Sequence, residues 1–162
     1  MEEKKIEITL YEAGGVNELT SEDAALLEKA AEATRSSYAP YSQFHVGAAV
    51  LLDNGEIICG SNQENAAYPS GLCAERVALF YATSKFSQVA IRTIAIYAMA
   101  NGKANPDPVY PCGACRQVLL ECENRSGQPI KVIMGSAQKI QMVHTISDLL
   151  PLAFDKFKNL KI

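Results

Sequence analysis

Apolar and polar positions along the first third of the chain change from a helical to a strand periodicity. Residues 20–38 begin with a threonine followed by acids and continue as an Ala/Leu-rich stretch, which predicts an amphipathic helix. The helix should end just before Pro40. Residues 44–62 hold two apolar runs joined by Asn54-Gly55, a dipeptide that tolerates the positive φ angles of a tight turn. We therefore predict a β-hairpin there.

The rest of the chain alternates between predicted helices and predicted buried strands. Apolar side chains recur at helical spacing after Cys73, and Pro111 introduces a second cysteine-headed helix. The predicted elements are a helix at residues 73–86, a near-continuous apolar strand at 89–100, a helix at 112–123, strands at 128–136 and 139–146, and a closing helical turn at 146–157, broken by Pro151. Strands that alternate with helices after a hairpin predict an α/β domain with a mixed sheet.

Length and composition fit one compact domain spanning residues 1–162. The 162 residues, of which 48% are hydrophobic, suffice for one well-packed core. Residues 1–19 form an amino-terminal extension of uncertain role. Within it, the alternation of Ile6, Ile8 and Leu10 suggests either an added edge strand or a subunit contact.

Charge and hydropathy narrow the class of partner. The net charge is −3, and Lys and Arg are scattered along the chain instead of forming blocks. The broad positive field of a nucleic-acid-binding protein is therefore missing, and a small-molecule partner is expected. The charged amino terminus has no apolar run of signal-peptide length, and nowhere does the chain hold the run of about 18 apolar residues that a membrane span needs. We expect no membrane partner and a cytoplasmic location.

The cysteines suggest a metal site. Five cysteines are an odd number, which argues against a disulfide framework. Cys112 and Cys115 form a CxxC unit whose sulfurs leave the same helical turn and can reach one ion, and Cys73, at the start of the other helix, is the natural third ligand. Three ligands without a fourth are typical of a catalytic zinc with an open position. Cys59 and Cys122 are interpreted as packing groups.

Glu75 and two arginines are candidates for roles around that metal. Glu75 follows Cys73 by two positions, so its carboxylate can lie beside the open zinc position as a general base. Alternatively, it is an acid favoured by the dipole of the first helical turn. Zinc with three thiolates carries a net charge of −1, so Arg76 and Arg116 are predicted to donate charge-assisted hydrogen bonds to the sulfurs. The alternative for each arginine is an ordinary exposed position.

Two other classes of protein use parts of this pattern. A redox protein could use the CxxC unit for thiol exchange, but this reading leaves Cys73 and Glu75 without a role. A structural zinc module would need a fourth ligand to close the site, and we find none in the motifs.

Four stretches together resemble the small three-cysteine cytidine deaminases. They are "SYAPYSQFHVGAAVL", "GSNQENAAYPSGLCAERVALF", "YPCGACRQVLLE" and "SDLLPLAF", which occur in the family's order. The resemblance covers residues 20–155. "CAE" with a distant "PCGAC" is the zinc-deaminase signature. The resemblance implies a three-layer αβα sandwich around a mixed five-stranded sheet, one Zn²⁺ per subunit and a homotetramer. It also implies hydrolysis of cytidine and 2'-deoxycytidine to uridine and 2'-deoxyuridine, with release of ammonia, in pyrimidine salvage.

The resemblance also implies individual roles. Cys73, Cys112 and Cys115 match the zinc ligands, and Glu75 matches the proton shuttle. The implied substrate contacts are Asn62 and Glu64 to the ribose, Phe44 beside the pyrimidine, the main chain of Ala74 and the carbonyl of Tyr110 or Pro111 near the base, and Phe154 stacking from a neighbouring subunit. For the two phenylalanines, ordinary core packing is the alternative.

Two related substrates remain as alternatives within this chemistry. A polymer-directed deaminase shares the metal site, but the acidic balance of the chain and the placement of Glu64, which a 3'-phosphate would meet, favour a free nucleoside. Among the alternatives, a deaminase of a modified cytosine nucleoside such as blasticidin S is the most similar to the predicted enzyme. The ribose-contact pair favours plain nucleosides over it.

Overall fold

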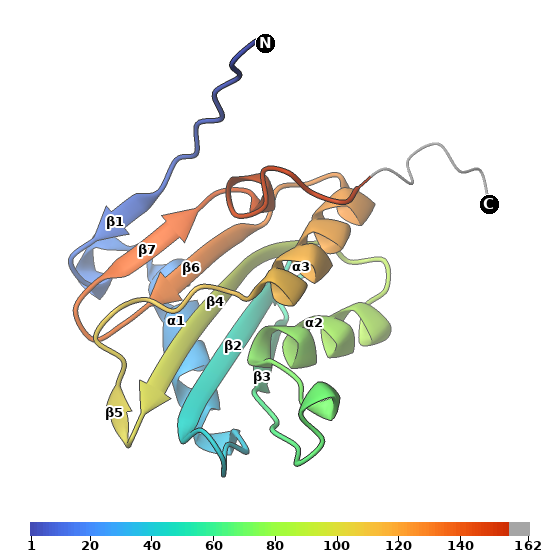
Figure 1. The fold of residues 1–162 in the computed structure, drawn as a ribbon. Coiled ribbons are helices and arrows are strands. Elements are labelled where there is room, and N and C mark those ends of the chain that lie inside the picture. The colour runs from blue at the N-terminus through green and yellow to red at the C-terminus, as the bar shows by residue number, and fades with distance from the viewer. Residues whose placement is uncertain (156–162) are drawn as a thin grey trace.

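The protein is a three-layer α/β structure, as the sequence predicted (Figure 1). The computed structural model describes residues 1–155. Helix α1 (Ser21–Ala33) covers one face of the sheet, and helices α2 (Ala74–Lys85) and α3 (Gly113–Ser126) cover the other. Short 3-10 turns lie at Val16–Glu18, Thr34–Ser36, Tyr68–Ser70 and Ile146–Asp148. The last turn begins the closing segment predicted at residues 146–157, part of which falls outside the described residues.

Within residues 1–155 the sheet has seven strands, so the expectation of five is corrected. The strands are β1 (Tyr11–Ala13), β2 (Phe44–Leu52), β3 (Ile57–Ser61), β4 (Ile91–Ala100), β5 (Lys103–Ala104), β6 (Lys131–Gly135) and β7 (Ile140–Val143). Their order is β1-β7-β6-β4-β2-β3, with β5 paired to β4. The β4–β6 pair is parallel and the other pairs are antiparallel. The two additional strands, β1 and β5, are too short to carry an apolar pattern of their own.

The amino-terminal extension supplies one of these additional strands. β1 pairs with β7 and forms one edge of the sheet. The edge strand suggested for the alternation of Ile6, Ile8 and Leu10 is therefore misplaced, because the strand forms at Tyr11–Ala13. Ile6, Ile8 and Leu10 are exposed and lie outside it.

Alternate residues of the central strands enter two separate cores. On β2, Ala48, Val50 and Leu52 join the cluster that packs against α2 and α3. Ala49 and Leu51 point the other way, into the cluster with α1. Because both faces are covered, the strand reads as a nearly continuous apolar run, which is why the hairpin was recognisable from sequence.

Two glycines of the β2–β3 hairpin allow helices to lie close against it. A Cβ atom on Gly60 would lie 2.6 Å from the carbonyl oxygen of Ala74, at the start of α2. A Cβ atom on Gly47 would lie 2.0 Å from the carbonyl oxygen of Ala30 in α1. The first contact presses the amino terminus of α2, and with it Cys73, against β3.

Within residues 1–155, no helix combines the length and the apolar character that crossing a bilayer requires.

Candidate metal centre and active site

Three cysteine sulfurs meet where helices α2 and α3 begin. Cys73 and Cys112 are the residues that precede the two helices, each with an extended backbone, and Cys115 lies in the first turn of α3. The Sγ atoms of Cys73 and Cys112 are 3.8 Å apart, and those of Cys112 and Cys115 are 3.5 Å apart. All three lie within 4.8 Å of one another. The predicted convergence of the two helix starts is therefore confirmed.

The spacing of the sulfurs fits a zinc ion. Zinc–thiolate bonds are about 2.3 Å long, so tetrahedral ligands lie about 3.8 Å apart. Among the described residues, no histidine, aspartate, glutamate or further cysteine joins the group. A zinc held here would keep one coordination position for water or substrate, as catalytic zinc does.

Arg76 supplies positive charge to the cluster. Its Nη2 atom lies 3.5 Å from Cys73 Sγ, as expected for a charge-assisted contact. The hydrogen bond with Cys115, followed by the one with Arg76, lowers the pKa of Cys73 to about 5. The same Cys73–Cys115 hydrogen bond raises the pKa of Cys115. Cys73 therefore loses its proton before Cys115, and the two helix amino termini further favour the thiolate.

Arg116 has partners different from those expected. Its Nε atom donates to the carbonyl oxygen of Pro111, and its Nη1 atom donates to that of Leu149, both at 2.8 Å. These bonds tie the residue before Cys112 to the carboxy-terminal segment. These two guanidinium nitrogens therefore face carbonyl oxygens instead of sulfurs.

Glu75 lies beside the sulfurs in a dry environment. It is the second residue of α2 and only 5% exposed. Burial is the main reason that the pKa of Glu75 is raised, and the charge of Cys73 adds to it, whereas a hydrogen bond with Cys115 opposes it. A carboxyl group that holds its proton more tightly than usual is suited to give and take protons near neutral pH.

A cavity of about 520 Å³ opens next to Cys73. Its lining combines aromatic, amide and charged side chains with one of the sulfur-bearing residues. The lining residues are Tyr41, Ser42, Asn62, Gln63, Glu64, Asn65, Tyr68, Gly71, Leu72, Cys73 and Arg76. The cavity thus connects the predicted ribose-contact pair with the metal cluster.

Glu64 is a fixed anion at this cavity. Its carboxylate accepts hydrogen bonds from the backbone N–H groups of Tyr41 and Ser42, at 2.9 and 3.3 Å, and from the Ser42 hydroxyl. The Ser42 hydroxyl and the Tyr41 N–H lower the pKa of Glu64. The carboxylate therefore stays ionised and oriented, with remaining lone pairs that can accept from a ligand hydroxyl.

Asn62 is anchored to the neighbouring strand. Its Oδ1 atom accepts from the N–H of Val46 at 2.8 Å, and its Nδ2 atom donates to the carbonyl of Phe44 at 2.9 Å. An amide group has a second N–H and a second lone pair, so Asn62 can still offer one donor to the cavity.

The other predicted substrate contacts are placed less centrally. Ala74 is fully buried as the first residue of α2, and Phe44 is half-buried at the start of β2. Neither lines the 520 Å³ cavity. Phe154 is 69% exposed, and its carbonyl accepts from Gln117 Nε2 at 2.9 Å. Within one chain, the structure therefore does not bring Phe154 into the cavity.

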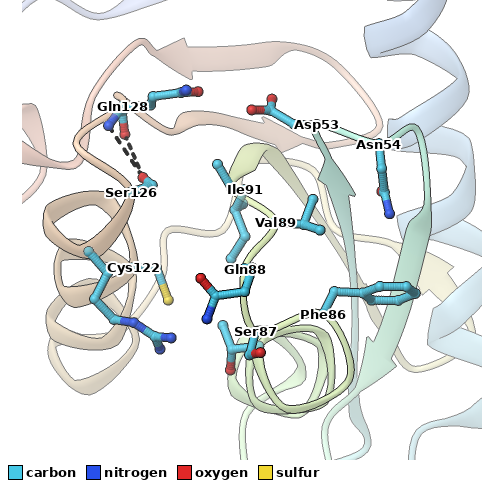
Figure 2. A pocket seen from close by; sticks show the side chains of 13 residues that line it. Asp53, Asn54, Phe86, Ser87, Gln88, Val89, Ile91, Cys122, Ser126 and Gln128 are labelled. Atoms are coloured by element: carbon cyan, nitrogen blue, oxygen red, sulfur yellow. Dashed lines mark hydrogen bonds between the residues drawn. The ribbon is translucent and has the colours of Figure 1, made fainter.

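A larger cavity lies away from this chemistry. Figure 2 shows its lining, which includes Phe86 at the end of α2 and Cys122 on α3, around a volume of about 740 Å³. Cys73 precedes the opposite end of α2, and twelve helical residues span about 18 Å at 1.5 Å each. Burial raises the pKa of Cys122, so this thiol stays protonated. Choosing the site by cavity volume alone would therefore have led away from the cysteine cluster.

Sequence reasoning missed two residues that shape the site. Ser42, which holds Glu64, lies in a quoted motif but carried no assigned role, and nothing in its local pattern predicts a partner 22 positions away. Gly60 could have been found, because a glycine within an apolar strand often marks a close backbone approach.

Comparison with known proteins identifies the family. Residues 20–127 match the family described as the cytidine and deoxycytidylate deaminase zinc-binding region. The chain belongs to this family. The matched range includes all three clustered cysteines and Glu75, so the zinc-binding region of the cytidine and deoxycytidylate deaminases coincides with the site described above.

Individual relatives agree with the family. A cytidine deaminase from Halalkalibacterium halodurans is 43% identical over 129 residues, which cover 80% of this chain and 91% of that protein. A cytidine deaminase from Sporosarcina psychrophila is 40% identical over 133 residues, covering 81% and 90%. The crystal structure of a cytidine deaminase from Burkholderia pseudomallei superposes with a TM-score of 0.71 at 37% identity, covering 84% of this chain and all of that chain.

Proposed function

We propose that this protein is a zinc-dependent hydrolase that deaminates cytidine and 2'-deoxycytidine to uridine and 2'-deoxyuridine, releasing ammonia. The observation that carries the proposal is the buried Glu75 beside three clustered sulfurs, next to a cavity with a fixed carboxylate. Membership of the deaminase family supports the same reaction.

Cys73, Cys112 and Cys115 are the proposed zinc ligands, one ion per subunit. When bound there, zinc would lower the pKa of a water molecule in its open position and so supply a nucleophile near neutral pH. Arg76 would offset the negative charge of the three thiolates through its contact with Cys73.

Glu75 is the proposed general acid–base. Its carboxylate takes a proton from the attacking water and delivers it to N3 of the cytosine ring, which makes C4 more electrophilic. After the water oxygen has bonded to C4, the carboxylate takes the second proton from the new C4 hydroxyl and gives it to the amino group; the C4–N bond then breaks, so that water and cytidine become uridine and ammonia. The raised pKa of Glu75, caused by burial, suits both transfers.

Asn62 and Glu64 are the proposed ribose contacts. The carboxylate accepts from a sugar hydroxyl while the free amide N–H of Asn62 donates to one. Phe44 and the main chain of Ala74 are proposed to lie beside the base. This arrangement favours a plain nucleoside over the free base and over the modified nucleoside blasticidin S, the alternative substrate.

The test is ammonia release from purified protein of known zinc content. We expect rapid release from cytidine and 2'-deoxycytidine, and at least about tenfold lower kcat/KM on cytosine, because the free base lacks the sugar hydroxyls for which the site provides hydrogen bonds. Faster turnover of blasticidin S than of cytidine would replace the substrate assignment. No release from any of these compounds by zinc-loaded protein would contradict the proposed reaction.

We further propose that the enzyme works as a homotetramer in which Phe154 enters a neighbouring subunit's site. Its exposure and the exposed Phe80 and Tyr81 on α2 support a subunit contact. Sedimentation should give four times the 17.5 kDa chain mass.

Phe154→Ala should raise the KM for cytidine about threefold to tenfold, which is the scale of one lost aromatic stack. Leu152→Ala removes an exposed side chain with no assigned contact and should leave the KM unchanged. A fully active monomer would contradict the shared site.

A cytoplasmic role in pyrimidine salvage is part of the proposal. The five cysteines are all free of disulfides, and zinc ligation needs reduced thiols, which fits a reducing compartment. Cell fractionation followed by the ammonia assay tests the location, and activity confined to an oxidising compartment would contradict it.

A further inference from the structure

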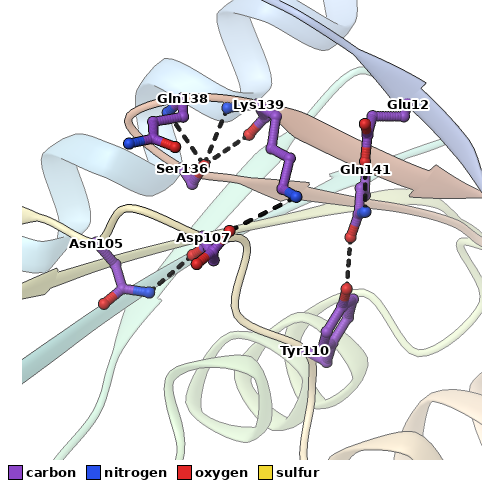
Figure 3. A network of polar contacts seen from close by, with 8 residues as sticks. All are labelled: Glu12, Asn105, Asp107, Tyr110, Ser136, Gln138, Lys139 and Gln141. Carbon is purple, nitrogen blue, oxygen red and sulfur yellow. Dashed lines mark hydrogen bonds and ion pairs between the residues drawn. The ribbon is translucent and has the colours of Figure 1, made fainter.

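A chain of hydrogen bonds connects the amino-terminal strand to Tyr110, two residues before the proposed zinc ligand Cys112. Glu12 on β1 and Gln141 on β7 are direct cross-strand partners, and Gln141 Nε2 donates to Glu12 Oε2 at 2.6 Å. Tyr110 Oη donates to Gln141 Oε1 at 2.5 Å. Figure 3 shows the three side chains in line, with Tyr110 pointing at the amide of Gln141.

Gln141 is fixed by having partners at both ends. It is only 7% exposed, so an unpaired amide there would lose its hydrogen bonds to water without replacement. The carboxylate of Glu12 can only accept, so it selects the NH₂ end of the amide and turns the carbonyl end toward Tyr110. Glu12 thereby sets which atom the tyrosine meets.

The tyrosine is the last anchor of the segment that leads to Cys112. Upstream, an ion pair between Lys139 and Asp107, with Nζ and Oδ1 3.6 Å apart, attaches the segment to the β6–β7 turn (Figure 3). The N–H of Ala137 in the same turn also donates to the carbonyl of Asn105. Tyr110 then precedes Cys112 by two positions, so its phenol is the final side-chain attachment to the sheet before the cysteine.

The Tyr110–Pro111 dipeptide is also held by a residue of α3. Arg116 Nε donates to the carbonyl oxygen of Pro111, the residue between Tyr110 and Cys112. One hydrogen bond draws the segment toward β7, and the other holds it to α3. With both made, the backbone that enters Cys112 has little freedom to rotate, although the Cys112 side chain itself is exposed.

We propose that Glu12, Gln141 and Tyr110 act together as positioning residues that fix the direction of Cys112 toward the metal. The extension that contributes β1 is thus part of the support of the zinc site. This inference rests on the proposed function in one respect, that Cys112 is a zinc ligand. Since orienting groups around a ligand commonly change metal affinity by about 10- to 100-fold, a more remote chain of contacts should act at or below the low end of that range.

The test compares Tyr110→Phe, Glu12→Ala and the double variant with Tyr11→Phe. Tyr110→Phe removes one oxygen atom and leaves the ring. Tyr11→Phe is the matched control, because it removes the same atom from a β1 residue whose ring packs edge-on against His144. Three quantities are measured on purified protein without substrate: the rate of zinc release to a chelator, the thiolate-to-cobalt absorption of the Co²⁺-substituted protein, and the melting temperature of the zinc-loaded form.

We expect zinc release about threefold to tenfold faster in Tyr110→Phe and in Glu12→Ala, with a changed cobalt spectrum and wild-type values in Tyr11→Phe. The double variant should release zinc no faster than the quicker single variant, because both substitutions break the same chain. Wild-type release rates and spectra in both single variants would overturn the proposal, as would melting temperatures that fall while release and spectra do not change. A wild-type protein that binds neither zinc nor cobalt would instead contradict the proposed function.

Discussion

Replacing Cys112 by serine is expected to lower zinc affinity by more than about 100-fold and to remove measurable deamination. Loss of an orienting group around a ligand already costs up to about 100-fold in metal affinity, and losing a ligand should cost more. Cys112 is exposed, so the smaller hydroxyl leaves no core cavity and the fold should persist. Zinc content after dialysis against a competing chelator, with the ammonia assay on the same sample, measures both effects.

The matched control is Cys122→Ser on the same helix, whose thiol lies outside the cluster and should leave zinc content and turnover unchanged. Arg76→Gln should fall between the two, with about 10- to 100-fold weaker zinc binding, because it removes charge from one thiolate contact without removing a ligand. Full zinc and full turnover in Cys112→Ser would show that Cys112 is not a ligand.

Replacing Glu75 by glutamine is expected to slow turnover at least about 100-fold while zinc stays bound. The amide matches the carboxyl group in size but can neither take nor give the proton, and a lost general acid–base typically costs about 10² to 10⁴-fold. Because burial raises the pKa of Glu75, the neutral amide resembles the protonated side chain and should not destabilise the fold. Single-turnover kinetics with zinc content measured in parallel provide the check.

Glu28→Gln, the same change at an exposed position of α1, controls for the loss of a carboxylate elsewhere. Near-normal turnover in Glu75→Gln would rule out the proton-transfer role and leave Glu75 as a first-turn acid of α2. A variant that loses its zinc would instead show that the carboxylate supports the metal. The hydrogen bond between Glu75 and Cys115 gives a route for such support.

Local patterns were sufficient for most of the fold. Thr20 caps α1 as expected, with its Oγ1 accepting from the N–H of Asp23 at 3.2 Å, and Gly55 adopts a positive φ in the hairpin turn. Both depend on residues within a few positions of each other. The strand count failed because β1 and β5 are held by pairing with β7 and β4, which a short local pattern cannot reveal.

The sequence by itself indicated three candidate thiol ligands at two helix starts and an acid two residues after the first, because these follow from residue type and spacing within short motifs. The proposed sugar contacts, a carboxylate and an amide, came from the family resemblance. Only the tertiary structure decided that Arg76 faces a sulfur while Arg116 binds carbonyls, and that Glu12 supports Tyr110 from 98 positions away through Gln141. The reason is physical: the partner of a side chain depends on where distant strands and helices pack, which residue spacing along the chain does not encode.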